Sequence, residues 1–238
     1  AIQPQPPQRP QPHMPQPIYR IERRGVPKQQ VELTLDGAKV SVPEGSTILQ
    51  ACATLQIEIP TLCWLETLHP VNVCRICVVE VEGARVLVPA CSRIVEPGMT
   101  VKTRSARVDL SRKLVLEMLA SSVDLSTTDK VGEWIKEYQA RPERFGPPAP
   151  PAAPGMRDAL MPGHHAPPNP DFAATVAQPT KVDNDLYVRD YARCILCYKC
   201  VEACGEDAQN TFAIAVAGRG FEAHIATQFE VPLPQSAC

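Results

Sequence analysis

The chain has 238 residues and nearly balanced charge, with 24 lysines and arginines against 26 aspartates and glutamates and a formal net charge of -2. This balance gives no indication of a nucleic-acid or anionic-membrane partner, and no apolar run is long enough to span a bilayer. Aromatic residues make up 5% of the chain and prolines number 26. The core is therefore expected to be small, with metal clusters or a partner surface helping to hold the chain together.

Residues 1–28 are a polar, proline-rich arm that begins AIQPQPPQRPQPHMPQP. Proline recurs too often there for a helix or a sheet, so the arm is either a disordered tail or a segment that wraps a partner. It has no basic region followed by an apolar region, so there is no sign of a secretory signal and a cytoplasmic location is expected.

Residues 29–105 predict a compact α+β module. Ser46 and Thr47 precede a short helix, TILQACATLQI, and are expected to cap it. Glycine turns divide the longer alternating stretches into hairpins. Strands are therefore expected within three stretches of alternating apolar and polar residues: 30–42, 77–90 and 99–103.

Residues 106–140 predict two helices. Apolar residues recur at helical spacing through 106–121. Candidate caps between Ser126 and Asp129 precede the second helix, KVGEWIKEYQA. The apolar positions expected on one face of the first helix are Val108, Leu110, Leu114, Leu116 and Leu119.

Proline is frequent again over 141–182, which contains PPAPPAAPG and PGHHAPPNPD. A loop of this length is improbable inside one compact domain, so the segment is interpreted as a linker that lies over a surface. The last module, 183–238, is expected to contain a hairpin, FAIAVAGRGFEAHIATQF, that turns at Ala217–Gly220.

Ten cysteines are the most informative feature of the composition. Most of them lie in two regions with short spacings, which favour metal ligation over disulfides in a chain without a secretory signal. Cys52 falls within a predicted helix and is interpreted as a small buried apolar residue. The full set is Cys52, Cys63, Cys74, Cys77, Cys91, Cys194, Cys197, Cys200, Cys204 and Cys238.

The first cysteine group has the spacing Cys63-x10-Cys74-x2-Cys77-x13-Cys91. Four thiolates hold a [2Fe–2S] cluster, with one pair for each iron. The alternative is a structural zinc site, because C-x2-C pairs also serve zinc. The other two cysteines are single residues on separate loops, and the flanking strands and helix suit a ferredoxin sheet. Both features favour iron–sulfur.

The second group is Cys194-x2-Cys197-x2-Cys200-x3-Cys204. This is the run of bacterial ferredoxins, in which the first three cysteines hold three corners of a [4Fe–4S] cluster. In two-cluster ferredoxins the fourth cysteine ligates the other cluster. The sequence therefore predicts one [4Fe–4S] cluster at this run and leaves open a second.

Several motifs over about 30–120 resemble the N-terminal ferredoxin domain of the complex I large iron–sulfur subunit: IPTLC, VCRICVVEVEG, VPACSR and VEPGMTVKT. They also resemble the related domains of NAD-linked formate dehydrogenases and of the diaphorase part of NAD-reducing hydrogenases. The resemblance implies a β-grasp fold. In that family one histidine and three cysteines follow and bind a [4Fe–4S] cluster. Residues 117–138 have no histidine and no cysteine, so that cluster is expected to be missing.

The stretch LYVRDYARCILCYKCVEACGEDAQ, with AVAGRGFEAHI, most resembles the formate dehydrogenase branch. In that branch a second four-cysteine run follows the hairpin, and its first cysteine would be Cys238, where the sequence stops. We therefore expect a longer native chain, in which Cys204 and Cys238 help to hold a second [4Fe–4S] cluster. The alternative is that Cys204 or Cys238 completes a single cubane.

No catalytic residues are expected, because no Ser/His/Asp set, phosphate-binding glycine loop or carboxylate pair stands out in the sequence. The chain is therefore expected to relay single electrons within a hetero-oligomeric complex. The resemblance implies a flavin/NAD-binding subunit at one end and a molybdenum or tungsten formate dehydrogenase subunit at the other. The alternatives are the diaphorase of a nickel–iron hydrogenase and, in a different class, a zinc-binding structural adaptor.

Overall fold

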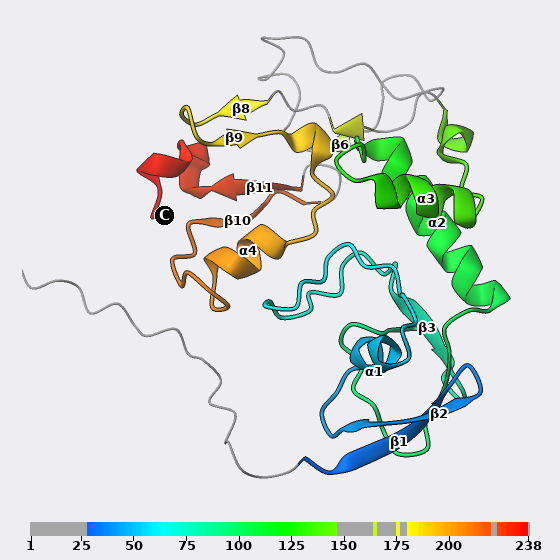
Figure 1. The fold of residues 1–238 in the computed structure, drawn as a ribbon. Coiled ribbons are helices and arrows are strands. Elements are labelled where there is room, and N and C mark those ends of the chain that lie inside the picture. The colour runs from blue at the N-terminus through cyan, green and yellow to red at the C-terminus, as the bar shows by residue number, and fades with distance from the viewer. Residues whose placement is uncertain (1–27, 147–163, 166–174, 177–179, 220–222, 238) are drawn as a thin grey trace, which may run out of the picture.

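The computed structural model of the chain describes residues 28–146, 164–165, 175–176, 180–219 and 223–237. Figure 1 shows the N-terminal sheet, in blue and cyan, at one end of the molecule and the last strands, in orange and red, at the other. Nearly all of the arm predicted over 1–28, much of the linker predicted over 141–182, and Cys238 lie outside the described residues.

A five-stranded mixed sheet forms the N-terminal module. Its strands are β1 (Gln30–Leu35), β2 (Ala38–Pro43), β3 (Val78–Val81), β4 (Val88–Pro89) and β5 (Thr100–Lys102). They lie in the order β2-β1-β5-β3-β4. β1 is antiparallel to β2 and parallel to β5, and β3 is antiparallel to β4 and β5. The strands and the α+β character expected for this module are confirmed.

The first hairpin turns at Asp36-Gly37, which confirms a glycine turn within the alternating stretch 30–42. Both residues have positive φ, 48° and 88°, which is the backbone of the tight turn that suits two twisted strands. The carboxylate of Asp36 also accepts hydrogen bonds from the backbone N–H of Thr103, at 2.8 Å, and from its hydroxyl, at 2.5 Å. The turn is thereby joined to the chain just beyond β5, a long-range contact that the local pattern did not reveal.

Helix α1 (Ile48–Thr54) begins where the sequence predicts. The Thr47 hydroxyl accepts from the Gln50 N–H and the Gln50 side chain accepts from the Thr47 N–H, so the two residues form a capping box. The helix ends earlier than expected because Gln56 takes a positive φ of 57°. Its buried face includes Cys52, fully buried in the core of the sheet, which confirms the interpretation of that cysteine as a core residue.

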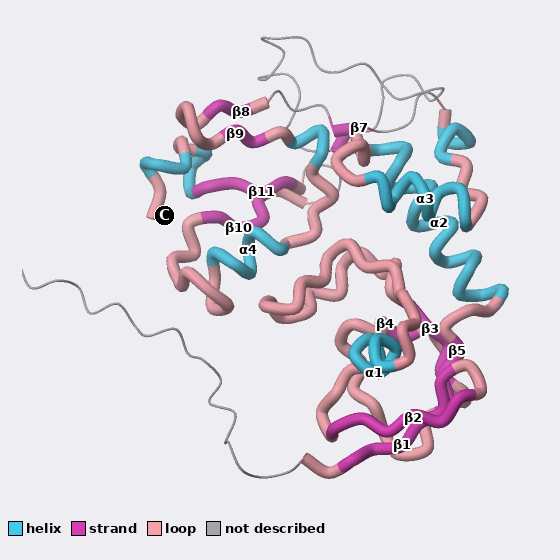
Figure 2. Tube along the Cα trace, in the orientation of Figure 1, coloured by secondary structure: helices cyan, strands magenta, loops and turns pink. Residues whose placement is uncertain are grey.

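Helices α2 (Ala106–Ser122) and α3 (Asp129–Glu137) confirm the two helices predicted over 106–140. Figure 2 shows them side by side next to the sheet. Ser105 caps α2 by accepting from the Val108 N–H at 3.3 Å. Thr128 is the N-cap residue of α3, but its side chain makes no capping hydrogen bond. The start of the helix was therefore predicted correctly, whereas the side-chain cap was not.

The face that α2 buries differs from the predicted one. Val108 and Leu116 are fully buried, as expected, but Leu110 is 56% exposed. Arg112 and Glu117 are each 1% exposed instead. The apolar pattern could not show this burial, because it depends on polar partners contributed by other parts of the chain.

The C-terminal part consists of short elements. The two strands of the expected C-terminal hairpin pair antiparallel, which confirms the hairpin, while Gly220 of the turn predicted at Ala217–Gly220 lies outside the described residues. Among the described residues, no helix has both the length and the apolar character needed to cross a membrane. The elements, in chain order, are η1 (Pro142–Phe145), β6 (His164–His165), β7 (Thr175–Val176), β8 (Lys181–Val182), β9 (Val188–Arg189), η3 (Tyr191–Arg193), α4 (Lys199–Cys204), β10 (Ile214–Ala217), β11 (His224–Thr227), η5 (Gln228–Glu230) and η6 (Leu233–Gln235).

Candidate iron–sulfur sites

The β3–β4 hairpin positions two of the predicted ligands. Cys77 immediately precedes β3, and Cys91 lies two residues beyond the end of β4. The Ala90 N–H donates to the Cys77 carbonyl at 3.2 Å, so the two cysteines face each other at the open end of the hairpin. Their Sγ atoms lie 3.4 Å apart, and both residues are buried.

Cys63 and Cys74 form a second pair on the loops between α1 and β3. Their side chains share a hydrogen bond, which lowers the pKa of Cys74 to about 5 and raises that of Cys63. In the first pair the hydrogen bond with Cys91 likewise lowers the pKa of Cys77, to about 7, and raises that of Cys91. Each pair therefore has one thiol that ionises readily, and the thiolate is the form that binds metal.

The arrangement of thiols in two pairs fits a binuclear cluster. A [2Fe–2S] cluster takes two thiolates at each iron, whereas a structural zinc site draws four ligands around one ion. In the described part of the chain, no three histidine, cysteine, aspartate or glutamate side chains come together closely enough to hold a single ion.

Asn72 is a neighbour of this site that sequence reasoning missed. Its side-chain oxygen accepts from the Ser92 hydroxyl at 2.7 Å and lies 3.3 Å from the Cys91 sulfur. Asn72 and Arg75 both have positive φ, 64° and 57°, so the loop before Cys77 turns sharply. An asparagine two residues before the C-x2-C pair was the only signal in the sequence.

The C-terminal cysteines lie on a tight loop that leads into α4. Leu196 and Tyr198 have positive φ, 52° and 61°, so the chain turns between successive cysteines. Burial raises the pKa of the Cys194 thiol. Cys194 and Cys197 are partly exposed, and Cys200 is exposed.

Cys204 differs from these three. It is buried at the end of α4, and its sulfur accepts from the Ala213 N–H at 3.0 Å. The Thr211 hydroxyl lies 3.3 Å from the same sulfur. The side chain is therefore engaged with the segment leading into β10. The assignment of these four cysteines as ligands stays a prediction.

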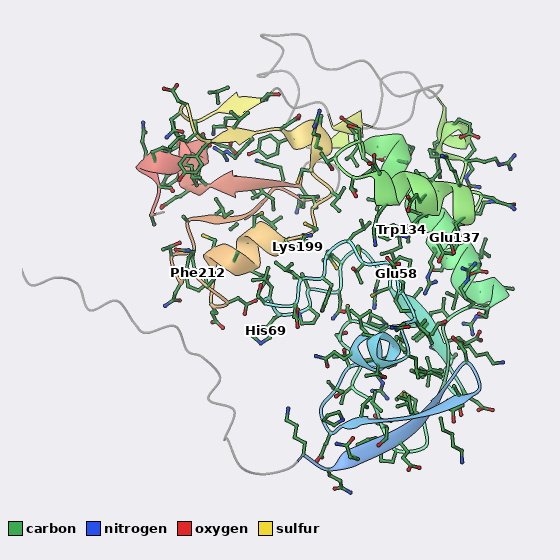
Figure 3. All side chains as sticks on the ribbon, viewed as in Figure 1. Glu58, His69, Trp134, Glu137, Lys199 and Phe212 are labelled. Carbon is green, nitrogen blue, oxygen red and sulfur yellow. The ribbon has the colours of Figure 1, made fainter. Side chains whose placement is uncertain are left out.

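The C-terminal module is joined to the preceding part of the chain at His69 and at Asp124. The backbone N–H of His69 donates to Asp207 at 2.6 Å, and the His69 ring also bonds this carboxylate. In Figure 3, His69 lies at the end of the cyan loop closest to α4. At the other contact, the Asp124 N–H donates to the Ala192 carbonyl at 2.8 Å. The two cysteine regions therefore belong to one connected structure.

Residues 28–106 match a family model described as a 2Fe-2S iron–sulfur cluster binding domain. Together with the mixed sheet, this match makes the N-terminal module similar to [2Fe–2S] cluster binding domains. The match ends at the first residue of α2, so the helices and the C-terminal module lie outside it.

Curated relatives extend the likeness over most of the chain. The NADP-reducing hydrogenase subunit HndD of Solidesulfovibrio fructosivorans is 39% identical over 217 residues, which are 87% of this chain and 33% of that protein. A subunit of the NADH-quinone oxidoreductase of Rhizobium meliloti is 32% identical over 202 residues, 84% of this chain and 21% of that protein. The chain thus spans a third or less of the length of these relatives.

A solved structure shares the fold. The crystal structure of an NAD+-reducing [NiFe]-hydrogenase in the H2-reduced state matches with a TM-score of 0.61 and 24% identity, covering 87% of this chain and 80% of that chain. None of these three proteins is named as a formate dehydrogenase. The comparisons therefore support the hydrogenase, the alternative expectation, better than the formate dehydrogenase expected first.

Proposed function

We propose that this chain is the iron–sulfur electron-transfer part of an NAD(P)-linked oxidoreductase of the hydrogenase or complex I type. The observation that carries the proposal is the arrangement of four thiols as two pairs within the segment that matches a [2Fe–2S] domain. A bound iron–sulfur cluster supplies one-electron chemistry. The chain's own residues hold the clusters, shield them and connect the two modules.

In this proposal Cys63 and Cys74 hold one iron of the [2Fe–2S] cluster, and Cys77 and Cys91 hold the other. The sheet order, with β1 parallel to β5 and α1 packed on the core, supports the β-grasp fold that the resemblance implies. Burial of three of these cysteines limits access of water, and both solvent access and hydrogen bonding tune the potential of such a site.

We also propose that Cys194, Cys197 and Cys200 hold three corners of a [4Fe–4S] cluster. Cys204, with Cys238, serves a second cubane or completes the first. The burial of Cys204 and its bond to the Ala213 N–H support a role for it that is separate from the first three.

For the terminal reaction we favour hydrogen oxidation or production coupled to a nicotinamide, with a flavin/NAD-binding subunit as one partner and a hydrogenase subunit as the other. The 39% identity to a protein named as an NADP-reducing hydrogenase subunit supports this choice. A complex I-type partner is the second candidate, supported by the NADH-quinone oxidoreductase relative.

Absorption spectroscopy tests the redox proposal. The anaerobically purified chain is expected to be brown, to bleach when dithionite is added, and to recover its colour with ferricyanide. A colourless protein that contains zinc would leave only the structural adaptor.

A further inference from the structure

Arg112 is buried in α2 and forms no ion pair among the described residues. Its guanidinium donates to the Tyr138 hydroxyl at 2.9 Å and to the Val78 carbonyl at 3.0 Å, and both acceptors are neutral. In the part of the chain that the structure describes, its Nε makes no hydrogen bond and no carboxylate forms an ion pair with it. A buried charge is costly unless it is paired, so this arginine calls for an explanation.

The other buried charge of the same helix is compensated. Glu117 accepts from the Arg141 N–H at 3.0 Å and pairs with the Arg144 guanidinium at 2.8 Å. Helix α2 therefore buries two charged residues of similar exposure, and only Arg112 lacks a partner of opposite sign within the described residues.

Arg112 contacts the chain next to one of the proposed cluster ligands. Its acceptor, Val78, is the residue after Cys77 in the chain. Its other acceptor, Tyr138, packs in a core cluster with Ile76 and with partly buried Cys74. The guanidinium is thus held against the Val78 peptide, which adjoins the proposed ligand Cys77.

We propose that Arg112 is the buried counter-charge of the [2Fe–2S] cluster and raises its reduction potential; this inference rests on the proposed function. A cluster ligated by four thiolates carries net negative charge, and each one-electron reduction adds to it. A fixed positive charge in a poorly screened interior stabilises the more negative, reduced form. Arg112 touches no ligating sulfur, so it is a positioning residue that acts through its field and through the Val78 peptide.

The inference also gives a function to a segment outside the matched domain. The match to the [2Fe–2S] family ends at residue 106, and Arg112 lies beyond it on α2. The segment that follows, 117–138, lacks the histidine and cysteines expected from the resemblance. In this chain, helix α2 would instead contribute the positive charge of Arg112 to the neighbouring [2Fe–2S] cluster.

The test is a redox titration of the [2Fe–2S] EPR signal in the full chain, with iron content measured for each variant. Arg112→Met is expected to lower the reduction potential of the cluster. At a fixed solution potential, the ratio of reduced to oxidised cluster is expected to fall roughly tenfold. A tenfold change corresponds to a shift of about 59 mV for a one-electron couple. Arg112→Gln is also neutral but keeps a donor for the Val78 carbonyl, so it carries the test if the methionine variant does not fold. Arg107→Met removes an exposed arginine from the same helix and is expected to leave the potential unchanged.

Arg112→Lys separates charge from structure, because it keeps the charge but cannot reproduce the two-pronged donation. A potential close to wild type in this variant supports the inference, and a loss as large as in Arg112→Met contradicts it. Clusters that load fully and titrate at one potential in every variant overturn the inference but leave the proposed function intact. Wild-type protein that holds no iron overturns both.

Discussion

Asp207 accepts two hydrogen bonds from His69, a residue 138 positions earlier in the chain. One comes from the His69 backbone N–H, at 2.6 Å, and the other from its ring. The Asp207 side chain is 5% exposed, whereas that of His69 is 80% exposed. The carboxylate therefore fixes the tip of the cysteine loop of the first module onto the turn that follows α4.

This junction is expected to depend on pH. Burial alone would raise the pKa of Asp207, but the hydrogen bonds from His69 outweigh it and hold the pKa below its ordinary value. A depressed pKa contributes stability that is present above the unfolded value, near 3.9, and is lost as pH falls through the lower folded value. Asp207→Asn is expected to speed hydrogen exchange over 65–73 at pH 7, with a difference from wild type that shrinks in acid.

Glu206→Gln is the matched control for that prediction, because it changes an exposed carboxylate one residue away. Equal exchange rates over 65–73 in wild type and Asp207→Asn at pH 7 would show that the carboxylate does not fix the loop.

Serine substitution tests the thiol pairs. Cys77→Ser removes one of four proposed ligands and is expected to abolish the [2Fe–2S] EPR signal and about two irons per chain. Cys52→Ser is the control, since burial and the Asp36 charge raise the pKa of this thiol to about 11, against an opposing effect of Arg112. It is expected to keep the iron and to cost about 1 kcal/mol of stability. If Cys52→Ser lost its iron while Cys77→Ser kept it, the assignment of Cys77 as a cluster ligand would be wrong.

The Asp36 turn is expected to stabilise the sheet over long range. Asp36→Ala removes two acceptors for Thr103 and places alanine at a positive φ, so a loss of about 2 kcal/mol in the free energy of unfolding is expected. Thr103→Val removes only the hydroxyl bond and is expected to cost about 1 kcal/mol. Urea denaturation measures both, and equal losses would show that the backbone bond contributes nothing.

The ion pair between buried Glu117 and exposed Arg144 lends itself to a double-mutant cycle. Arg144→Ala leaves the carboxylate of Glu117, 1% exposed, without its counter-charge and is expected to cost about 2 kcal/mol. Because Arg144 is 47% exposed, the loss is expected to be smaller than for a fully buried pair. The double variant with Glu117→Leu is expected to recover much of the loss. Additive losses would mean that the pair does not interact.

Local pattern was enough to predict most elements of the N-terminal module. Alternation predicted the hairpins, and Thr47 marked the start of α1. Spacing singled out the first four-cysteine group as candidate ligands, which stays a prediction. These features depend on short stretches of sequence, where turn and cap chemistry are specific.

Long-range polar contacts could not be predicted in this way. The spacing of apolar residues on α2 placed Leu110 in the core, whereas the structure buries Arg112 and Glu117 there. Their partners come from other elements, as does the Asp207 partner of His69, and hydrophobic periodicity carries no information about them.

The resemblance likewise led to formate dehydrogenase, because the motif residues alone do not determine the terminal reaction.

The most direct test of the central claim is the iron and acid-labile sulfide content of the anaerobically purified native protein, measured with EPR of the reduced sample. One [2Fe–2S] and one [4Fe–4S] cluster correspond to about six irons per chain, and a second cubane raises this to about ten. Either value, with the signal of a reduced [2Fe–2S] cluster, agrees with an electron-transfer chain. Zinc in place of iron would contradict it.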